Sequence, residues 1–146
     1  MLGELAYDGM CVALSGELGT GKTVLAKGIA EGMQIAPEEV VSPSFTIARQ
    51  YEAKDGRRRF CHVDLYRLSG EVEAESSGLH DYMCPPWVTA VEWPERAPTL
   101  LPSDRIEIRL THAGECVRRV DLKALGEDSS NVLYQIREIG GPRRIY

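Results

Sequence analysis

The chain has 146 residues, a mass of 16.2 kDa and a formal net charge of −5. This length favours one domain, which can bury a core without disulfide bonds or a structural metal. Hydrophobic residues (43%) and charged residues (27%) occur in the proportions of a soluble globular protein, and the acidic balance argues against broad, sequence-independent binding to nucleic acid, which relies on a basic surface.

The first predicted elements surround a glycine-rich segment. Residues 10–14 form a continuous apolar run, which predicts a strand buried on both faces. The segment GELGTGKT follows at residues 16–23. Residues 22–33 place apolar side chains on one stripe, which predicts a helix. Gly28 and Gly32 lower its intrinsic stability and are expected to let it pack closely on a sheet.

The middle of the chain alternates between strand and helix signals. Residues 47–53 and 60–65 are predicted strands, joined at the turn signal Asp55-Gly56. Residues 69–82 predict a helix, because their acidic start suits the positive end of the helix dipole.

Further strands and a tail are predicted in the last part of the chain. Residues 87–91 form a short predicted strand, and residues 105–110 and 117–122 alternate in polarity as a hairpin. The predicted fold class is α/β, with a mixed sheet that is parallel near the glycine-rich segment, antiparallel C-terminal strands and flanking helices. Residues 126–146 are expected to be a partly ordered tail, in which the apolar positions of residues 132–139 could dock a short helix.

The segment GELGTGKT matches the phosphate-binding pattern G-x-x-x-x-G-K-[ST] at Gly16, Gly21, Lys22 and Thr23. Glycines let the backbone wrap a phosphate with several N–H groups pointing inward, and the following helix offers its positive end. The lysine then reaches the β- and γ-phosphates, and the threonine hydroxyl faces Mg²⁺. Residues 1–125 are therefore predicted to be one P-loop domain.

ATP is the expected nucleotide. The dinucleotide pattern G-x-G-x-x-G fails, because its third glycine would fall at Val24. GTPases of the switch type usually carry an N-K-x-D motif that reads guanine, but the one asparagine of the chain, Asn131, is followed by Val132.

A P-loop enzyme needs a carboxylate at the end of a neighbouring strand, and two residues qualify. Asp64 ends the segment FCHVD, and Glu92 ends VTAVE. Their positions do not decide which holds the Mg²⁺ shell and which serves the attacking water, and either could instead cap the next element. The segment SPSFT, residues 42–46, lies where switch-type enzymes place a hydroxyl near the γ-phosphate. It could also be a strand edge that starts at a proline.

Nothing in the sequence indicates secretion or a membrane. The N-terminus has no basic region followed by a long apolar segment, and no apolar run is long enough to cross a bilayer. The four cysteines are scattered, without a C-x-x-C pair, and Cys11 and Cys61 lie in apolar strand-like runs. We therefore expect a cytoplasmic protein with reduced thiols.

Five segments together resemble one family. GELGTGKT, SPSFT, HVDLYRL, GLHDYM and VEWPE occur in the order and spacing of the bacterial TsaE (YjeE) family. The resemblance runs from the first residues to about Leu122. The phosphate loop is shared by many families, whereas the DLYR and EWPE segments together are specific.

The resemblance implies an ATPase, slow on its own, that supports the threonylcarbamoyl modification of adenosine in tRNA. In that family the protein joins TsaB and TsaD, and TsaD transfers the threonylcarbamoyl group, so tRNA is reached only through the complex. The resemblance thus implies ATP and Mg²⁺ as cofactors, TsaB and TsaD as partners, and no contact with a membrane.

The resemblance also implies roles for single residues. Lys22, Asp64 and Glu92 are the expected catalytic residues, and Asp64 would orient the water or the metal shell. Thr23 and Glu92 are the expected Mg²⁺ ligands. The expected nucleotide contacts are Glu17, Leu18, Gly19, Thr20, Gly21, Lys22, Thr23, Ser44 and Trp93.

This chain departs from the family pattern at several places. The family usually has Thr where this chain has Ser44, which loses the methyl group that restricts the rotamer, and Ala where it has Thr20. The opening LGELA resembles the middle of the family's first helix, so the family's opening strand is expected to be missing, either through a misplaced start codon or because the sheet lacks an edge. The tail after Gly126 is longer than expected.

Two other functions fit the P-loop. The first is a small-molecule or nucleotide kinase, in which the basic run Arg57–Arg59 would form a lid over the phosphates. The second is a binding module that holds ATP without hydrolysing it. A kinase transfers the γ-phosphate to an acceptor, an ATPase releases it to water, and a binding module leaves ATP intact.

Overall fold

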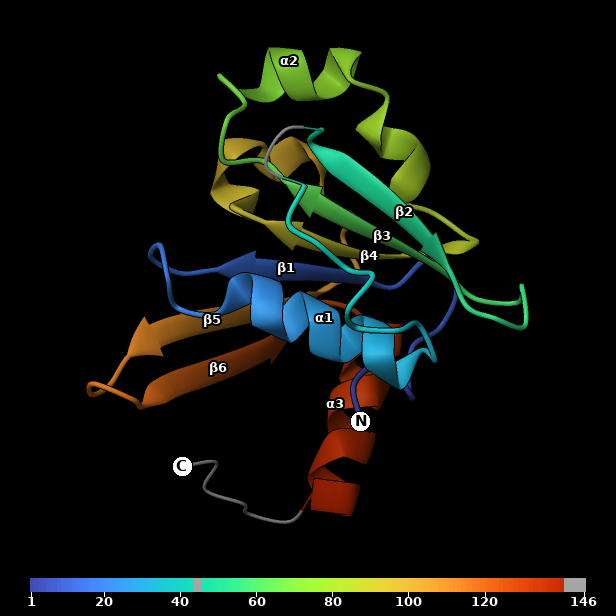
Figure 1. The fold of residues 1–146 in the computed structure, drawn as a ribbon, viewed down its shortest axis with the longest axis vertical. Helices are drawn as coiled ribbons and strands as arrows, with labels where there is room; N and C mark the ends of the chain where they lie inside the picture. The colour runs from blue at the N-terminus through green and yellow to red at the C-terminus, as the bar shows by residue number, and fades with distance from the viewer. Residues whose placement is uncertain (44–45, 141–146) are drawn as a thin grey trace.

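The computed structural model describes residues 1–43 and 46–140. Within these residues a six-stranded sheet has the order β2-β3-β4-β1-β5-β6 (Figure 1). The strands are β1 (Cys11–Ser15), β2 (Ala48–Glu52), β3 (Arg59–Asp64), β4 (Trp87–Glu92), β5 (Ile106–His112) and β6 (Arg118–Ala124). The α-helices are α1 (Lys22–Gly32), α2 (Glu71–Ser76) and α3 (Glu127–Gly140), and short 3-10 turns are η1 (Leu79–Tyr82), η2 (Pro94–Arg96) and η3 (Pro98–Leu100).

The four central strands β3, β4, β1 and β5 run parallel, and the outer strands β2 and β6 pair antiparallel with them. The sequence predicted this parallel core and the antiparallel C-terminal pair, and both are confirmed. The hairpin predicted at Asp55-Gly56 is also confirmed, as the antiparallel pair of β2 with β3 at the other edge of the sheet. The carboxyl ends of the parallel strands therefore meet at one edge, where ligands of open α/β sheets bind.

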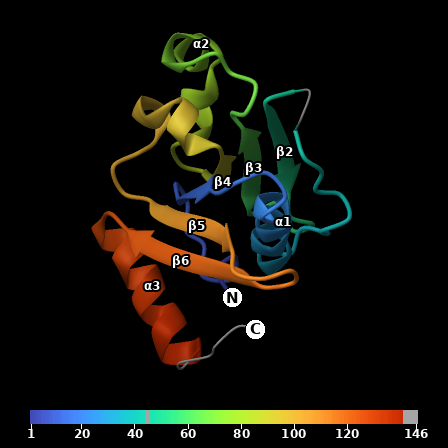
Figure 2. The same cartoon turned by 90° about the vertical axis from the view of Figure 1, so that its left-hand side faces the viewer.

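Helices cover both faces of the sheet (Figures 1 and 2). One apolar cluster joins α1 and α3 to Val12 and Leu14 of β1 and to Met10, which directly precedes the strand. The other cluster lies beneath α2 and the 3-10 turns and includes Cys11, Cys61 and Val63. Neighbouring residues of β1 belong to opposite clusters, because side chains alternate along a strand. This is why the strand reads as an unbroken apolar run.

The predicted helix over residues 69–82 is divided into α2 and η1. Gly78 lies between them with φ 73°, a left-handed conformation that favours glycine and interrupts a helix. The acidic start is present, as Glu71 and Glu73 lie in the first turn of α2. The sequence pattern thus located the segment correctly but joined two short elements into one.

The two glycines of α1 have different roles. A Cβ at Gly32 would lie 3.0 Å from the Cα of Gly3, and one at Gly3 would lie 1.9 Å from the carbonyl oxygen of Ile29. Gly32 therefore permits close packing, but against the N-terminal segment and not against the sheet as the sequence predicted. Gly28 meets no atom within 4 Å, so its position does not demand a glycine.

Residues 127–140 of the expected tail form α3, a helix of 14 residues. It packs through Val132 and Leu133, which belong to the apolar cluster of α1. Residues 141–146 lie outside the described residues. None of the helices in the described part of the chain is both long and apolar enough to cross a membrane.

Candidate functional site

The glycine-rich segment forms a tight loop between β1 and α1. Gly16 has φ 144° and Gly21 has φ 103°, backbone conformations that residues with a side chain rarely adopt. A Cβ at Gly16 would also lie 2.4 Å from the carbonyl oxygen of Leu110. These glycines let the chain turn sharply from the strand into the helix, whose first N–H groups have no partner within the helix. The loop is therefore suited to binding an anion.

Lys22 bends back over this loop. Its Nζ donates hydrogen bonds to the carbonyl oxygens of Gly16 (2.8 Å) and Glu17 (2.9 Å), and it lies 4.2 Å from the centre of the Trp93 ring. Burial lowers the pKa of the Lys22 ammonium below its ordinary value, and nearby carboxylates, Glu92 first, act against that shift. The ammonium is thus held at the loop with little water around it, where an anion would interact with it strongly.

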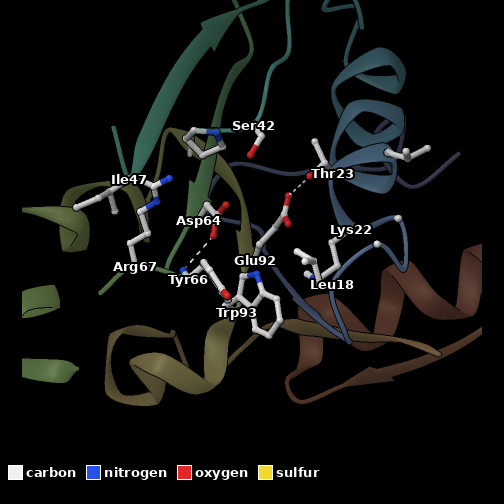
Figure 3. Close-up of a pocket in the computed structure, with 14 residues that line it drawn as sticks. Leu18, Lys22, Thr23, Ser42, Ile47, Asp64, Tyr66, Arg67, Glu92 and Trp93 are labelled. Atoms are coloured by element: carbon white, nitrogen blue, oxygen red, sulfur yellow. Dashed lines mark hydrogen bonds between the residues drawn. The ribbon is translucent and has the colours of Figure 1, made fainter. Parts of the chain in front are cut away.

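A cavity of about 520 Å³ opens beside the loop at the carboxyl edge of the sheet (Figure 3). Its walls come from the loop, the start of α1, the ends of β3 and β4, and the segments that follow or precede them. The lining residues are Leu18, Gly19, Gly21, Lys22, Thr23, Val24, Ser42, Pro43, Ile47, Asp64, Tyr66, Arg67, Glu92 and Trp93.

Glu92 lies at the centre of the polar contacts. Its Oε1 accepts a hydrogen bond from Thr23 Oγ1 at 2.8 Å and lies 2.8 Å from His62 Nε2. The carboxylate is almost fully buried. A hydroxyl from α1 and a carboxylate from β4, 69 positions apart in sequence, therefore face one another beside the phosphate-binding loop.

Asp64 ends the neighbouring strand and pairs in register with Glu92. Its Oδ1 accepts a hydrogen bond from the backbone N–H of Tyr66 at 3.0 Å, which fixes the carboxylate at the start of the loop after β3. Both predicted carboxylates thus lie side by side in one cavity, and the structure separates their contacts: Glu92 touches the Thr23 hydroxyl, whereas Asp64 lies on the side of Glu92 away from α1 and touches the Tyr66 N–H (Figure 3).

Trp93 follows Glu92 in a left-handed conformation, with φ 59°. This turn directs its ring toward Lys22 and toward Tyr66, whose ring centre lies 5.0 Å away. A positive φ is uncommon for a residue without a short polar side chain, and such backbone strain is concentrated at functional sites.

Two predicted nucleotide contacts do not line the cavity with their side chains. Thr20 is buried, and its Oγ1 donates to the carbonyl oxygen of Glu17 at 2.8 Å, so it closes the loop from inside instead of lying on the loop crest. The side chain of Glu17 is exposed. Ser44 lies outside the described residues.

Several residues of the site were not predicted from the sequence. Tyr66, Arg67 and Ile47 line the cavity, and the first two directly follow Asp64-Leu65, so a search of the loop after the strand would have found them. His62 lies two positions before Asp64, and alternation along the strand places both on the same face. The two-residue repeat of side chains along a strand could therefore have indicated His62 as a neighbour of the site.

The described residues contain no group of three or more His, Cys, Asp or Glu side chains that could hold a metal ion by themselves. The oxygen atoms of Thr23 and Glu92 are nevertheless of the kind that Mg²⁺ prefers. Mg²⁺ commonly uses one or two protein ligands together with phosphates and water. The pair therefore fits a magnesium site that the phosphates of a ligand would complete.

Comparison with known proteins agrees with these observations. The model of the TsaE family, described as threonylcarbamoyl adenosine biosynthesis protein TsaE, matches residues 1–120. A tRNA threonylcarbamoyladenosine biosynthesis protein TsaE from Bacillus subtilis is 39% identical over 121 residues, covering 83% of this chain and 73% of that protein. The protein of the same name from Streptomyces coelicolor is 38% identical over 130 residues, covering 86% and 87%.

A solved structure shows the same fold. The crystal structure of YdiB from Bacillus subtilis matches with a TM-score of 0.74 and 30% identity, covering 94% of this chain and 86% of that chain. The family match spans the phosphate loop, both strand-end carboxylates and β5, and ends within β6. The chain belongs to the TsaE family.

Proposed function

We propose that the chain binds Mg-ATP in the cavity beside the phosphate loop and hydrolyses it slowly on its own. The observation that carries this proposal is the contact between Thr23 Oγ1 and Glu92 Oε1, 2.8 Å long, at the start of α1. It joins the hydroxyl of a phosphate-binding motif to a strand-end carboxylate, which is the pair that P-loop NTPases use around their metal.

The protein's own residues would act as follows. Backbone N–H groups of the loop and the start of α1 bind the phosphates, helped by the positive end of the helix dipole. Lys22 exchanges its two contacts with loop carbonyls for contacts with phosphate oxygens. Thr23 and Glu92 hold Mg²⁺, which when bound neutralises part of the phosphate charge.

Asp64 is proposed to orient the attacking water. It lines the cavity on the wall away from α1 and is held by the Tyr66 N–H, so one carboxylate oxygen has a fixed direction. Ser42, from the segment SPSFT, lines the same cavity. We propose that this segment responds to the γ-phosphate, as switch loops do.

The role of this ATPase is proposed from its relatives, which are named for tRNA threonylcarbamoyladenosine biosynthesis. We propose that the chain acts in the cytoplasm with TsaB and TsaD and supports repeated threonylcarbamoyl modification of tRNA adenosine without transferring the group itself. We also propose that residues 1–125 form a domain of the P-loop NTPase class.

The kinase alternative relied on Arg57–Arg59 as a lid. These arginines lie at the turn that begins β3, whereas Asp64 ends that strand. Five steps of about 3.3 Å place Arg59 roughly 16 Å from Asp64, and Arg59 pairs with Glu52 at 3.2 Å. The basic run therefore lies away from the cavity and offers the kinase function no support.

The test uses calorimetric titration of Mg-ATP and a phosphate-release assay on the parent and on Lys22→Ala. Since a hydrogen bond to a charged group contributes about 1.5–3 kcal/mol, the variant should bind at least tenfold more weakly. Equal affinity of the variant and the parent would refute the site. Transfer of the γ-phosphate to a small acceptor would favour a kinase, and tight binding with ATP left intact would favour a binding module.

A further inference from the structure

His62 is completely buried in β3, next to the strand that carries Glu92. Its Nε2 lies 2.8 Å from Glu92 Oε1, the oxygen that also accepts the hydrogen bond from Thr23 Oγ1. In the register of the two parallel strands His62 faces Ala90, two residues before Glu92. Alternation places the imidazole and the carboxylate on the same face of the sheet.

The other ring nitrogen distinguishes the two neutral tautomers of the imidazole. His62 Nδ1 is buried and has no hydrogen-bond partner among the described residues. A neutral ring with its proton on Nε2 donates that proton to Glu92 and leaves Nδ1 without a hydrogen. The other neutral tautomer would place a bare nitrogen against a carboxylate oxygen and bury an N–H group without an acceptor, which is costly.

We propose that His62 is a positioning residue for the magnesium-binding carboxylate. The imidazole N–H holds Glu92 Oε1 against the Thr23 hydroxyl, so that both oxygens are in place before the metal binds. The ring is itself held in the core, where its centre lies 6.5 Å from the centre of the Phe60 ring, with the ring planes inclined by 30°. His62 acts through Glu92 and touches neither nucleotide nor metal.

This inference rests on the proposed function, because the metal is part of that proposal. Hydrogen-bond partners that orient a metal ligand typically change metal affinity or activity 10–100-fold when they are removed. A histidine that only filled the core would change folding stability and leave the metal dependence of nucleotide binding unaltered. The two roles therefore predict different measurements.

The first measurement needs no ligand. The chain has three histidines, and His62→Phe identifies the ¹⁵N signals of residue 62 by their loss. In the parent protein we expect the long-range ¹H–¹⁵N spectrum to show residue 62 with its proton on Nε2 and a bare Nδ1. A proton on Nδ1 alone would overturn the proposal.

The second measurement compares His62→Phe, which keeps a ring without a donor, with His62→Gln, which keeps an N–H donor on a flexible side chain. ATP binding is titrated in EDTA and at a series of Mg²⁺ concentrations. For His62→Phe we expect unchanged affinity in EDTA and a 10–100-fold higher Mg²⁺ concentration at half-saturation. His62→Gln should restore part of the loss.

Each outcome has a meaning. Equal Mg²⁺ dependence of the parent and His62→Phe, or equal loss in both variants, overturns the positioning role. If His62→Phe does not fold, His62→Leu takes its place as the variant without a donor, His62→Gln remains the matched control, and the same outcomes decide. If neither variant without a donor folds, the tautomer measurement decides, with His62→Gln used to assign the signals of residue 62. If the parent does not bind Mg-ATP at all, the proposed function fails, and the tautomer measurement still decides whether His62 donates to Glu92.

Discussion

At the scale of single residues, the two strand-end carboxylates differ in what they touch. Glu92 is buried and accepts from Thr23 and His62 through one oxygen, whereas Asp64 accepts a backbone N–H at the rim of the loop after β3. These contacts favour Glu92 for the metal and Asp64 for the water. Position in the sequence left the choice open, because both residues end apolar strands.

The substitutions Asp64→Asn and Glu92→Gln test this division. Both keep the shape of the side chain and an oxygen acceptor, so folding should be retained while ATP turnover falls by roughly 10²-fold or more. Glu92→Gln should also raise the Mg²⁺ requirement, and Asp64→Asn should do so much less. The measurements are phosphate release against Mg²⁺ concentration and thermal unfolding. A variant that hydrolyses ATP like the parent would remove that residue from the mechanism.

The four thiols should divide into two classes. Burial raises the pKa of Cys11 to about 12, with Arg105 acting against the shift, and burial raises that of Cys61 to about 12. Cys84 and Cys116 are exposed. Because the thiolate is the reactive form, an Ellman titration of the native protein at pH 8 should show two fast thiols and two that react only on unfolding. Four fast thiols would contradict the buried positions of Cys11 and Cys61.

At the scale of elements, α3 is anchored through a residue distant in sequence. The Asp104 carboxylate accepts hydrogen bonds from the backbone N–H groups of Asp128 (2.9 Å) and Ser129 (3.1 Å). It lies so close to Gly126 that a Cβ there would approach the carboxylate carbon to 2.1 Å. The start of α3 is therefore capped by a side chain from the segment before β5.

Asp104→Ala should detach or fray α3. Loss of a capping carboxylate costs about 0.5–2 kcal/mol, and hydrogen exchange of residues 127–140 should become faster while that of β1 changes little. Asp104→Asn, which keeps an acceptor, is the matched control and should show a smaller change. Unaltered exchange in the alanine variant would show that Val132 and Leu133 hold the helix without the cap.

The hydrogen bonds from the start of α3 to the Asp104 carboxylate should weaken as the pH falls. Burial acts to raise the pKa of Asp104, but the hydrogen bonds from Ser129 and its neighbours outweigh it and hold the pKa below its ordinary value. A lowered pKa means that the stabilisation is present above the unfolded value of about 3.9 and is lost as pH falls through the folded value. The protection of α3 should therefore decline in acid, and in Asp104→Asn this part of the decline should be missing.

The sequence predicted the elements better than the contacts between them. Apolar runs, alternating polarity and turn signals located every strand of the sheet to within about two residues, because each of these patterns is local in the sequence. The extent of α3 was underestimated, since its cap comes from Asp104, and the helix of residues 69–82 was not seen to break at Gly78.

The candidate site was predictable only where its motif is local. The loop from Gly16 to Thr23 is contiguous and carries its own signal, and strand ends indicated Asp64 and Glu92. The bond from Thr23 to Glu92 and the bond from His62 to Glu92 join segments that only the strand order brings together. No local pattern contains that order, so the orientation of the carboxylate could not be read from the sequence.

At the scale of the whole molecule, the cavity beside the phosphate loop has a rim of exposed apolar side chains. Leu18, Val24 and Tyr66 are 77%, 72% and 48% exposed, and all three line the cavity. Exposed apolar groups that gather at one site commonly mark a binding surface. Ser42 and Pro43 of the proposed switch segment line the same cavity, so a protein bound at the rim could respond to the state of that segment.

We therefore predict nucleotide-dependent binding to a TsaB–TsaD pair. If the segment acts as a switch, ATP would order it and hydrolysis would release it, so the affinity of the partners should differ between the two states. A net charge of −5 suits docking on a protein better than gripping tRNA directly, because phosphate contacts need a basic face. Pull-downs with ATP, ADP or no nucleotide should capture different amounts of the pair.

Lys22→Ala, which cannot hold the phosphates, should abolish multiple-turnover tRNA modification in a reconstituted system. The substitution Arg58→Ala, in the turn away from the cavity, should leave that modification unchanged. If the pair binds equally in all three conditions and modifies tRNA repeatedly without this chain, the coupled role is refuted even though the chain binds ATP.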